Sequence, residues 1–124
     1  MAWKKTTNHV TRETITIDAT GKIVGRLASE IARLLMGKDK ATYVPHVDSG
    51  AIIKVTHADK LALTGKKMEQ KVIHRSSNRP HGVKSTPVSR LQVERPGYML
   101  VHAVKYMLPK NHLQSERMKR LIIV

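Results

Sequence analysis

Two spacings of hydrophobic positions follow each other near the start of this 124-residue chain. Residues 14–17, TITI, alternate polar and apolar β-branched side chains, which predicts a short strand. Over residues 23–35 the apolar positions recur at helical spacing, and Gly37 follows where a helix commonly ends on a left-handed residue. We therefore expect a strand and then an amphipathic helix, with Asp18 or Thr20 as the cap of that helix.

The middle of the chain predicts further strands. Residues 51–55 and 61–64 are short, mostly apolar runs bounded by turn-forming residues, so both are expected to be buried strands. Residues 72–73 predict another short strand. Residues 76–86 are a Ser, Asn, Pro and Gly stretch without a period, which is typical of a loop.

The last third of the chain predicts helices. Residues 87–94 favour a weak helix, and residues 96–108 favour a stronger one that the following proline ends. Asn111 and Gln114 resemble a capping box, which predicts a last short helix running into the apolar residues 121–124. Because strands and helices interleave, the pattern favours an α/β layer architecture with a mostly parallel sheet.

Charge changes this picture from a plain α/β domain to one with an anionic partner. The chain has 23 Lys and Arg against 9 Asp and Glu, a formal net charge of +14, so self-repulsion favours a polyanion as partner. Its 40% hydrophobic residues are enough for a packed interior. Residues 1–12 are polar and carry no acidic residue, so we expect a basic N-terminal arm there, followed by one domain over residues 13–124.

Several functional classes are disfavoured by what the sequence lacks. The absence of cysteine excludes disulfides, zinc fingers and thiol nucleophiles. The seven histidines are scattered and the nine carboxylates form no acid–base pair, so we predict no catalytic residue, no metal site, no cofactor and no small-molecule substrate. No apolar run approaches the ~20 residues of a membrane span, and no signal peptide is evident, so we expect a soluble, unsecreted protein without a membrane partner.

Two Gly-Lys pairs raise the question of a nucleotide-binding loop. A phosphate-cradling Walker loop requires G-x-x-x-x-G-K-[ST], and neither pair has the first glycine or the final hydroxyl residue. The pair at 21–22 is followed by Ile23, and the pair at 65–66 by Lys67. The first pair is better explained as a strand-to-helix turn. A small nucleotide-using enzyme stays open as an alternative.

The densest positive charge lies in residues 64–84, TGKKMEQKVIHRSSNRPHGVK, with a local net charge of +5 against the single acid Glu69. We predict that its basic side chains bind backbone phosphates and that binding weakens as salt rises. These residues are Lys66, Lys67, Lys71, Arg75, Arg79 and Lys84.

The aromatic content bears on which nucleic acid this would be. The chain has no Phe, one Trp and three Tyr, whereas the sheet-stacking mode of RNA recognition requires surface aromatics. The G-x-x-G loop that clamps single-stranded RNA is also missing. We therefore expect recognition of backbone and shape, which suits folded RNA.

Three stretches carry a resemblance to a known family: IDATGKIVGRLASEIARLLMGKDKATYVPHVDSG at 17–50, KLALTGKK at 60–67, and AVKYMLPKNHL at 103–113. In that order and spacing, the chain resembles the universal large-subunit ribosomal protein thirteen family in its bacterial form, over about residues 14–124. The resemblance implies a single three-layer α/β domain with a mostly parallel central sheet and helices on both faces. It also implies binding to large-subunit ribosomal RNA beside neighbouring large-subunit ribosomal proteins, early in subunit assembly, in the cytoplasm and without catalysis.

The same resemblance implies RNA contacts at matching positions, which are Lys38, Lys40, Thr64, Gly65, Lys66, Lys67, Lys110 and Asn111. The chain departs from the family at residues 74–82, HRSSNRPHG, where the family usually has an aromatic, glycine-rich loop. There we expect the Arg79 guanidinium to replace a stacking ring. Tyr106 and Gln114 stand where the family commonly has glycine. A free regulatory RNA-binding protein stays open as the second alternative.

Overall fold

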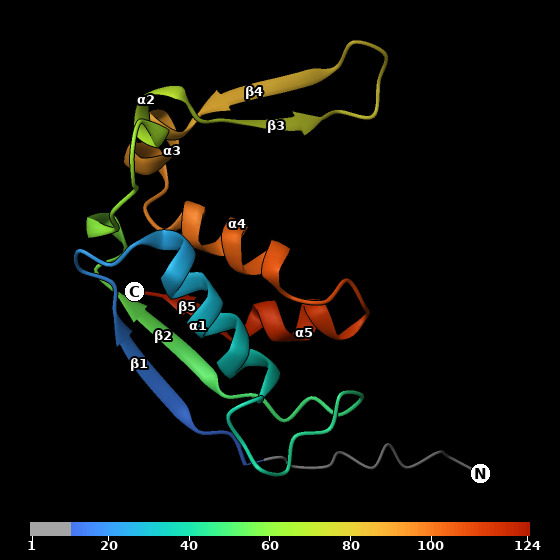
Figure 1. The fold of residues 1–124 in the computed structure, drawn as a ribbon. Coiled ribbons are helices and arrows are strands. Elements are labelled where there is room, and N and C mark those ends of the chain that lie inside the picture. Colours follow the sequence, from blue (N-terminus) through green and yellow to red (C-terminus); the bar gives the residue numbers. More distant parts are fainter. Residues whose placement is uncertain (1–10) are drawn as a thin grey trace.

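The computed structural model describes residues 11–124, so residues 1–10 of the predicted arm lie outside the described part of the chain. Figure 1 shows the order of the elements along that part. They are β1 (Thr14–Asp18), α1 (Val24–Met36), β2 (Ile52–Thr56), the 3-10 helix η1 (Ala58–Lys60), α2 (Lys67–Gln70), β3 (Val72–Ser76), β4 (Val83–Pro87), α3 (Val88–Glu94), α4 (Tyr98–Met107), α5 (Leu113–Lys119) and β5 (Leu121–Ile123).

The main sheet has three strands in the order β1-β2-β5, and both pairs are parallel. In its register Ile17 lies beside Val55 and Val55 lies beside Ile123. Because side chains alternate between the two faces of a strand, this row places apolar residues from all three strands on one face. The predicted parallel sheet is confirmed for these strands, while β3 and β4 form a separate antiparallel pair.

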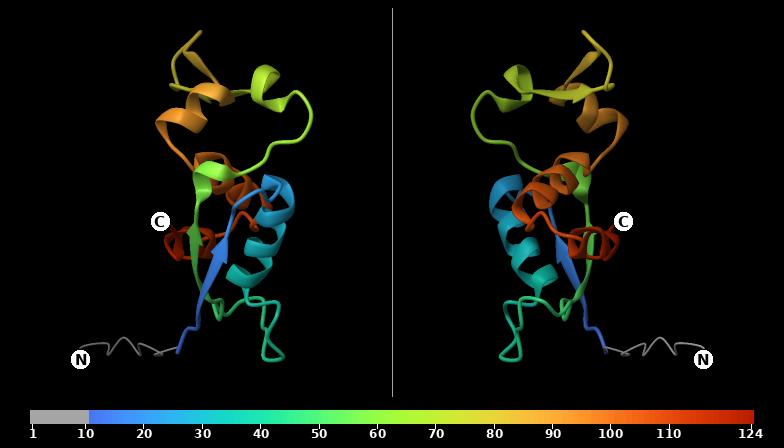
Figure 2. Two further views of the ribbon diagram at one scale, coloured as in Figure 1. Left: turned by 90° about the vertical axis from the view of Figure 1, so that its left-hand side faces the viewer. Right: turned by 90° about the vertical axis from the view of Figure 1, so that its right-hand side faces the viewer.

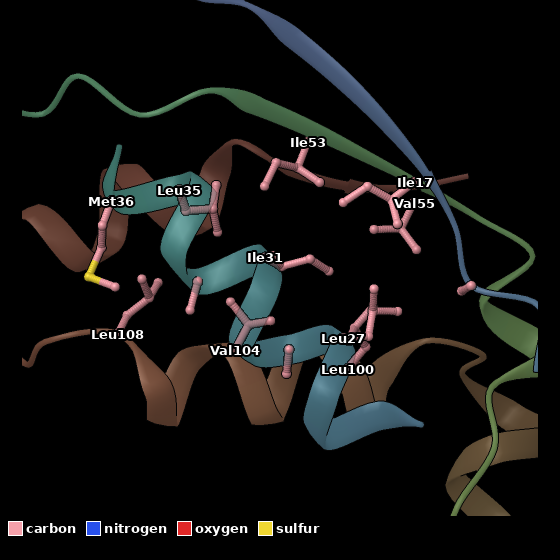
Figure 3. Packing of buried hydrophobic residues seen from close by; sticks show 13 residues of the cluster. Ile17, Leu27, Ile31, Leu35, Met36, Ile53, Val55, Leu100, Val104 and Leu108 are labelled. Atoms are coloured by element: carbon pink, nitrogen blue, oxygen red, sulfur yellow. The ribbon is translucent and has the colours of Figure 1, made fainter. Parts of the chain in front are cut away.

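The core lies between the apolar face of this sheet and two helices. Figure 3 shows α1 between the sheet on one side and α4 on the other, with Leu27 and Ile31 of α1 among the buried side chains and Leu100 and Val104 contributed by α4. Full burial of one such aliphatic side chain contributes about 1.5–3 kcal/mol. At the end of α1, Gly37 adopts the predicted left-handed conformation with φ 79°, and its amide donates to a carbonyl of the last turn.

The opposite face of the sheet is exposed at its middle. Thr16, Lys54 and Ile122 lie side by side on it, and all three are exposed. The left view of Figure 2 shows β1 and β2 with α1 to their right and the red helix α5 to their left. The α/β class and the parallel pairing of the three strands are confirmed, while the three exposed side chains show that no described helix covers the middle of this face.

Two strand predictions also change. Residues 61–64 make only an isolated bridge, between Ile23 and Ala62. Helix α1 begins directly after Ile23, so there is no extended segment with which residues 61–64 could form a longer strand pair. The predicted loop 76–86 is reduced to residues 77–82, since β3 extends to Ser76 and β4 begins at Val83. The strand β4 has no apolar alternation, so sequence periodicity could not indicate it.

Both predicted helix caps are wrong. Helix α1 begins after Ile23, which makes no side-chain cap. Asp18 instead accepts hydrogen bonds from the backbone N–H (3.0 Å) and the hydroxyl (2.8 Å) of Thr20, and these lower the pKa of the Asp18 carboxyl to about 2. The Gln114 side chain donates to the carbonyl of Lys105 (2.6 Å) rather than forming a capping box.

A cluster of arginines around Asp48 fixes the long loop between α1 and β2. Arg120 donates to both carboxylate oxygens of Asp48, Arg12 Nη2 lies 3.5 Å from Oδ2, and the Arg117 Nε, on a side chain only 2% exposed, lies 3.6 Å from Oδ1. Burial raises the pKa of Asp48, but the arginines, Arg120 first, outweigh this and hold it below its usual value. The cluster joins the start of β1, this loop and the α5–β5 connection.

Candidate nucleic-acid interface

The hairpin of β3 and β4 projects away from the sheet and its covering helices (Figure 1). Nearly all of its residues are exposed, with only Ile73 and Thr86 half-buried near its base. Arg75 pairs directly with Lys84 across the two strands. Like charges at directly opposed positions destabilise an antiparallel pair, so this hairpin holds a repulsion that an anion between the strands would relieve.

A tight turn closes the hairpin and presents Arg79. The Ser77 amide donates to the Gly82 carbonyl (2.8 Å), and Asn78 adopts a positive φ of 60°. A Cβ at Gly82 would lie 2.0 Å from the Ser77 hydroxyl oxygen and 3.0 Å from the Arg79 carbonyl oxygen, so a larger residue there would force the Ser77 side chain to rotate away. Arg79 is exposed at the end of this turn.

The segment before the hairpin places a second group of cations close to its base. Gly65 has φ +64° and begins the turn into α2, after which Lys67 Nζ donates to the Thr64 hydroxyl (3.2 Å). An open hollow of about 470 Å³ is lined by Thr64, Gly65, Lys66, Lys67, Gln70 and Lys71. Five of the predicted contact residues therefore lie together around one concave surface.

We call the following six residues the basic hairpin surface: Lys66, Lys67, Lys71, Arg75, Arg79 and Lys84. All six are exposed. None of the six makes a salt bridge within the described residues 11–124. Their charge is therefore free to bind an external anion. The three lysines line the hollow near the base of the hairpin, Arg75 and Lys84 are paired across its strands, and Arg79 lies in its turn.

The remaining predicted contacts lie elsewhere. Lys38 and Lys40 lie in the loop after α1, where Lys40 Nζ donates to the Ser49 carbonyl (3.0 Å). Lys110 and Asn111 lie in the α4–α5 loop. Neither pair joins the basic hairpin surface, yet the hairpin and both loops project toward the right-hand side of Figure 1.

Sequence reasoning missed one feature close to this surface, a row of rings on α4. Tyr98, His102 and Tyr106 are spaced one turn apart, with ring centroids 6.1 Å apart for the first two and 4.7 Å for the last two. Lys110 Nζ lies 6.0 Å from the centroid of the Tyr106 ring. The i, i+4, i+8 spacing of these three residues is the signal in the sequence that indicates such a row.

Neither a metal-binding cluster nor a membrane-spanning helix is found in residues 11–124. Across residues 11–124, no three or more His, Asp or Glu side chains gather in a way that could hold a metal ion. None of the helices described there is long and apolar enough to cross a membrane.

An α/β body bearing one exposed, densely cationic hairpin is typical of a nucleic-acid-binding module. Residues 12–124 match the sequence model of ribosomal protein L13, and the chain belongs to that family, which consists of ribosomal proteins and not of enzymes. It is 49% identical to the large ribosomal subunit protein uL13 of Caldanaerobacter subterraneus subsp. tengcongensis, over 90% of this chain and 78% of that protein. It is 46% identical to the uL13 proteins of Legionella pneumophila strain Corby, over 92% of this chain and 79% of that protein, and of Thermotoga petrophila, over 90% and 75%.

Proposed function

We propose that this chain is a structural constituent of the large ribosomal subunit that binds large-subunit ribosomal RNA through the basic hairpin surface and assists early subunit assembly in the cytoplasm. Its further partners are neighbouring large-subunit ribosomal proteins. In this proposal the α/β body over residues 13–124 is the scaffold, and the N-terminal residues 1–12 form a basic arm.

The pairing of Arg75 with Lys84 on an exposed hairpin carries this proposal. A two-stranded hairpin without a second layer is only marginally stable in water, and like charges directly opposite each other weaken it further. A phosphate bound between two such cations replaces repulsion with two charge-assisted hydrogen bonds. The loops of Lys38 and Lys110 extend on the same side and provide further contacts to one large, folded polyanion.

Sedimentation distinguishes this function from that of a free RNA-binding regulator. The tagged protein in cell extract is expected to migrate with large subunits through a gradient at moderate and at high salt. Migration as a free protein beside an intact large subunit would contradict the proposal and favour the regulatory alternative.

The salt dependence of binding tests the surface itself. Replacing Lys66 and Lys67 by Glu is expected to flatten the plot of log affinity for large-subunit ribosomal RNA against log salt, by about 0.7–0.9 for each lost phosphate contact. The double variant Lys54→Glu with Lys60→Glu makes the same change in net charge away from the hairpin and is the matched control. If both variants showed the same slope, the basic hairpin surface would not be the RNA contact.

A further inference from the structure

The rings of α4 form an exposed platform that the proposed phosphate contacts leave unused. We call Tyr98, His102 and Tyr106 the aromatic row. Its outer end, Tyr106, is 66% exposed, so this ring is accessible to a partner. Tyr98 at the other end is half-buried against the buried residues Val24, Val88 and Met99, so the base of the row is fixed by the body.

The row separates two hollows. One, of about 340 Å³, lies between the row and β3 and is lined by residues that include Ile73, Arg75 and Lys105. The other, of about 360 Å³, lies toward α1 and is lined by residues that include Lys67 and Lys71. Both are lined by His102 and Tyr106, so each gives access to these rings. Each is within the size range of sites that take small planar groups.

The charges around the row favour an anionic occupant. The residues that line the two hollows include four cations, from Arg75, Lys105, Lys67 and Lys71, and no Asp or Glu. Partial burial, followed by the nearby Lys71 and Lys105, lowers the pKa of His102 below its ordinary value. At neutral pH the ring is therefore uncharged, with one nitrogen as donor and the other as acceptor.

We propose that the aromatic row binds an unpaired base of the RNA, which stacks on Tyr106 while Lys71, Lys105 and Lys110 contact the flanking phosphates. This inference rests on the proposed function and adds single-stranded recognition to it. A protruding ring beside cations is the arrangement by which proteins hold unstacked bases, because every base offers a π-face and every nucleotide a phosphate. Low aromatic content does not prevent this, since α4 collects two of the three tyrosines on one line.

Four variants test the inference by affinity for full-length large-subunit ribosomal RNA over a range of salt. Tyr106→Ala is expected to weaken binding at least about fivefold without changing the salt slope, since stacking of one base is uncharged. Tyr106→Phe keeps the ring and is expected to bind like the wild type. Val93→Ala removes an exposed apolar side chain on α3 and is the control. Lys71→Ala is expected to flatten the slope instead.

Crosslinking of reconstituted large subunits with short-wavelength ultraviolet light provides a second measurement. The peptide containing Tyr106 is expected to carry a crosslinked nucleotide. Unchanged affinity of Tyr106→Ala, with wild-type binding intact, would overturn the stacking inference and leave the proposed function standing. Loss of a neighbouring ribosomal protein from Tyr106→Ala subunits, with unchanged affinity for naked RNA, would also overturn it and assign the row to a protein contact. Failure of the wild-type chain to bind the RNA would overturn the proposed function itself.

Discussion

In the α/β body, Ile53 and Val55 of β2 are fully buried beneath α1, whereas in the hairpin Arg75 and Lys84 face each other in solvent. In the body, the half-buried Asp48 is surrounded by arginines, while the cations of the hairpin have no acidic partner in the described chain. Both regions are rich in basic residues, so composition alone does not separate them. Pairing and burial do.

This contrast separates the stability of the free protein from its binding. Substitutions in the body remove packing or ion pairs that the isolated chain already has, so they change the free energy of unfolding. Substitutions in the hairpin remove charge that the isolated chain does not use, so they change binding with little loss of stability. The predictions below test that separation, in decreasing order of expected effect.

Asp48→Asn is expected to lower the free energy of unfolding by about 3–5 kcal/mol, because it leaves the buried Arg117 and its neighbours without their counter-charge. Urea unfolding measures this loss. Asp39→Asn, in the exposed part of the same loop, is the control and is expected to stay within about 0.5 kcal/mol of the wild type. An equal, small effect of both variants would show that the arginine cluster does not hold the body.

Acid is expected to remove part of the same stabilisation. The pKa of Asp48 is lower in the folded than in the unfolded chain, so its contribution is fully present above the unfolded value of about 3.9 and is lost as pH falls through the folded value. The difference in unfolding free energy between wild type and Asp48→Asn should therefore be constant near neutral pH and shrink below about pH 4. A difference independent of pH down to the acid transition would contradict this.

Arg75→Ala with Lys84→Ala is expected to flatten the salt dependence of RNA binding by roughly 1.4–1.8, for two lost phosphate contacts. Its far-UV circular dichroism and unfolding midpoint should stay close to those of the wild type. Lys54→Ala with Lys60→Ala removes two exposed cations away from the hairpin for comparison. A collapse of stability in the hairpin variant would show that the two regions are not energetically separate.

The smallest expected effect is opposite in sign. Lys84→Thr relieves the repulsion from Arg75 and adds a β-branched residue to the strand, so the free hairpin should be more stable by about 0.2–1 kcal/mol. Hydrogen exchange of the β3 and β4 amides would detect slower local opening. Faster exchange in this variant would mean that Lys84 supports the hairpin rather than strains it.

The sequence predicted elements where one side of a segment is buried. The apolar periods of α1 and α4 and the alternation in β1 reflect burial against the core, and each of these elements is present. The strand β4, by contrast, has an exposed pattern, so no apolar period could reveal it. Strand order and the extent to which helices cover each face of the sheet could not be predicted, because they depend on tertiary contacts that a local pattern does not contain.

The basic hairpin surface was predictable from charge density, since its six residues lie within twenty positions of one another and a hairpin keeps such residues close. The convergence of three arginines on Asp48 could not be predicted in this way, because Arg12, Asp48 and the neighbouring Arg117 and Arg120 lie in three distant parts of the chain and nothing local marks one arginine as buried. Tyr106 is marked in the sequence by its spacing from His102 and as a departure from the resembled family.

The most direct test replaces all six residues of the basic hairpin surface by Gln and measures affinity for large-subunit ribosomal RNA as a function of salt, beside the unfolding free energy. The slope of log affinity against log salt is expected to fall by roughly 4–5 while stability changes little, because six phosphate contacts are lost and no core contact is. An unchanged slope in a folded variant would contradict the account, since RNA would then be bound by another surface.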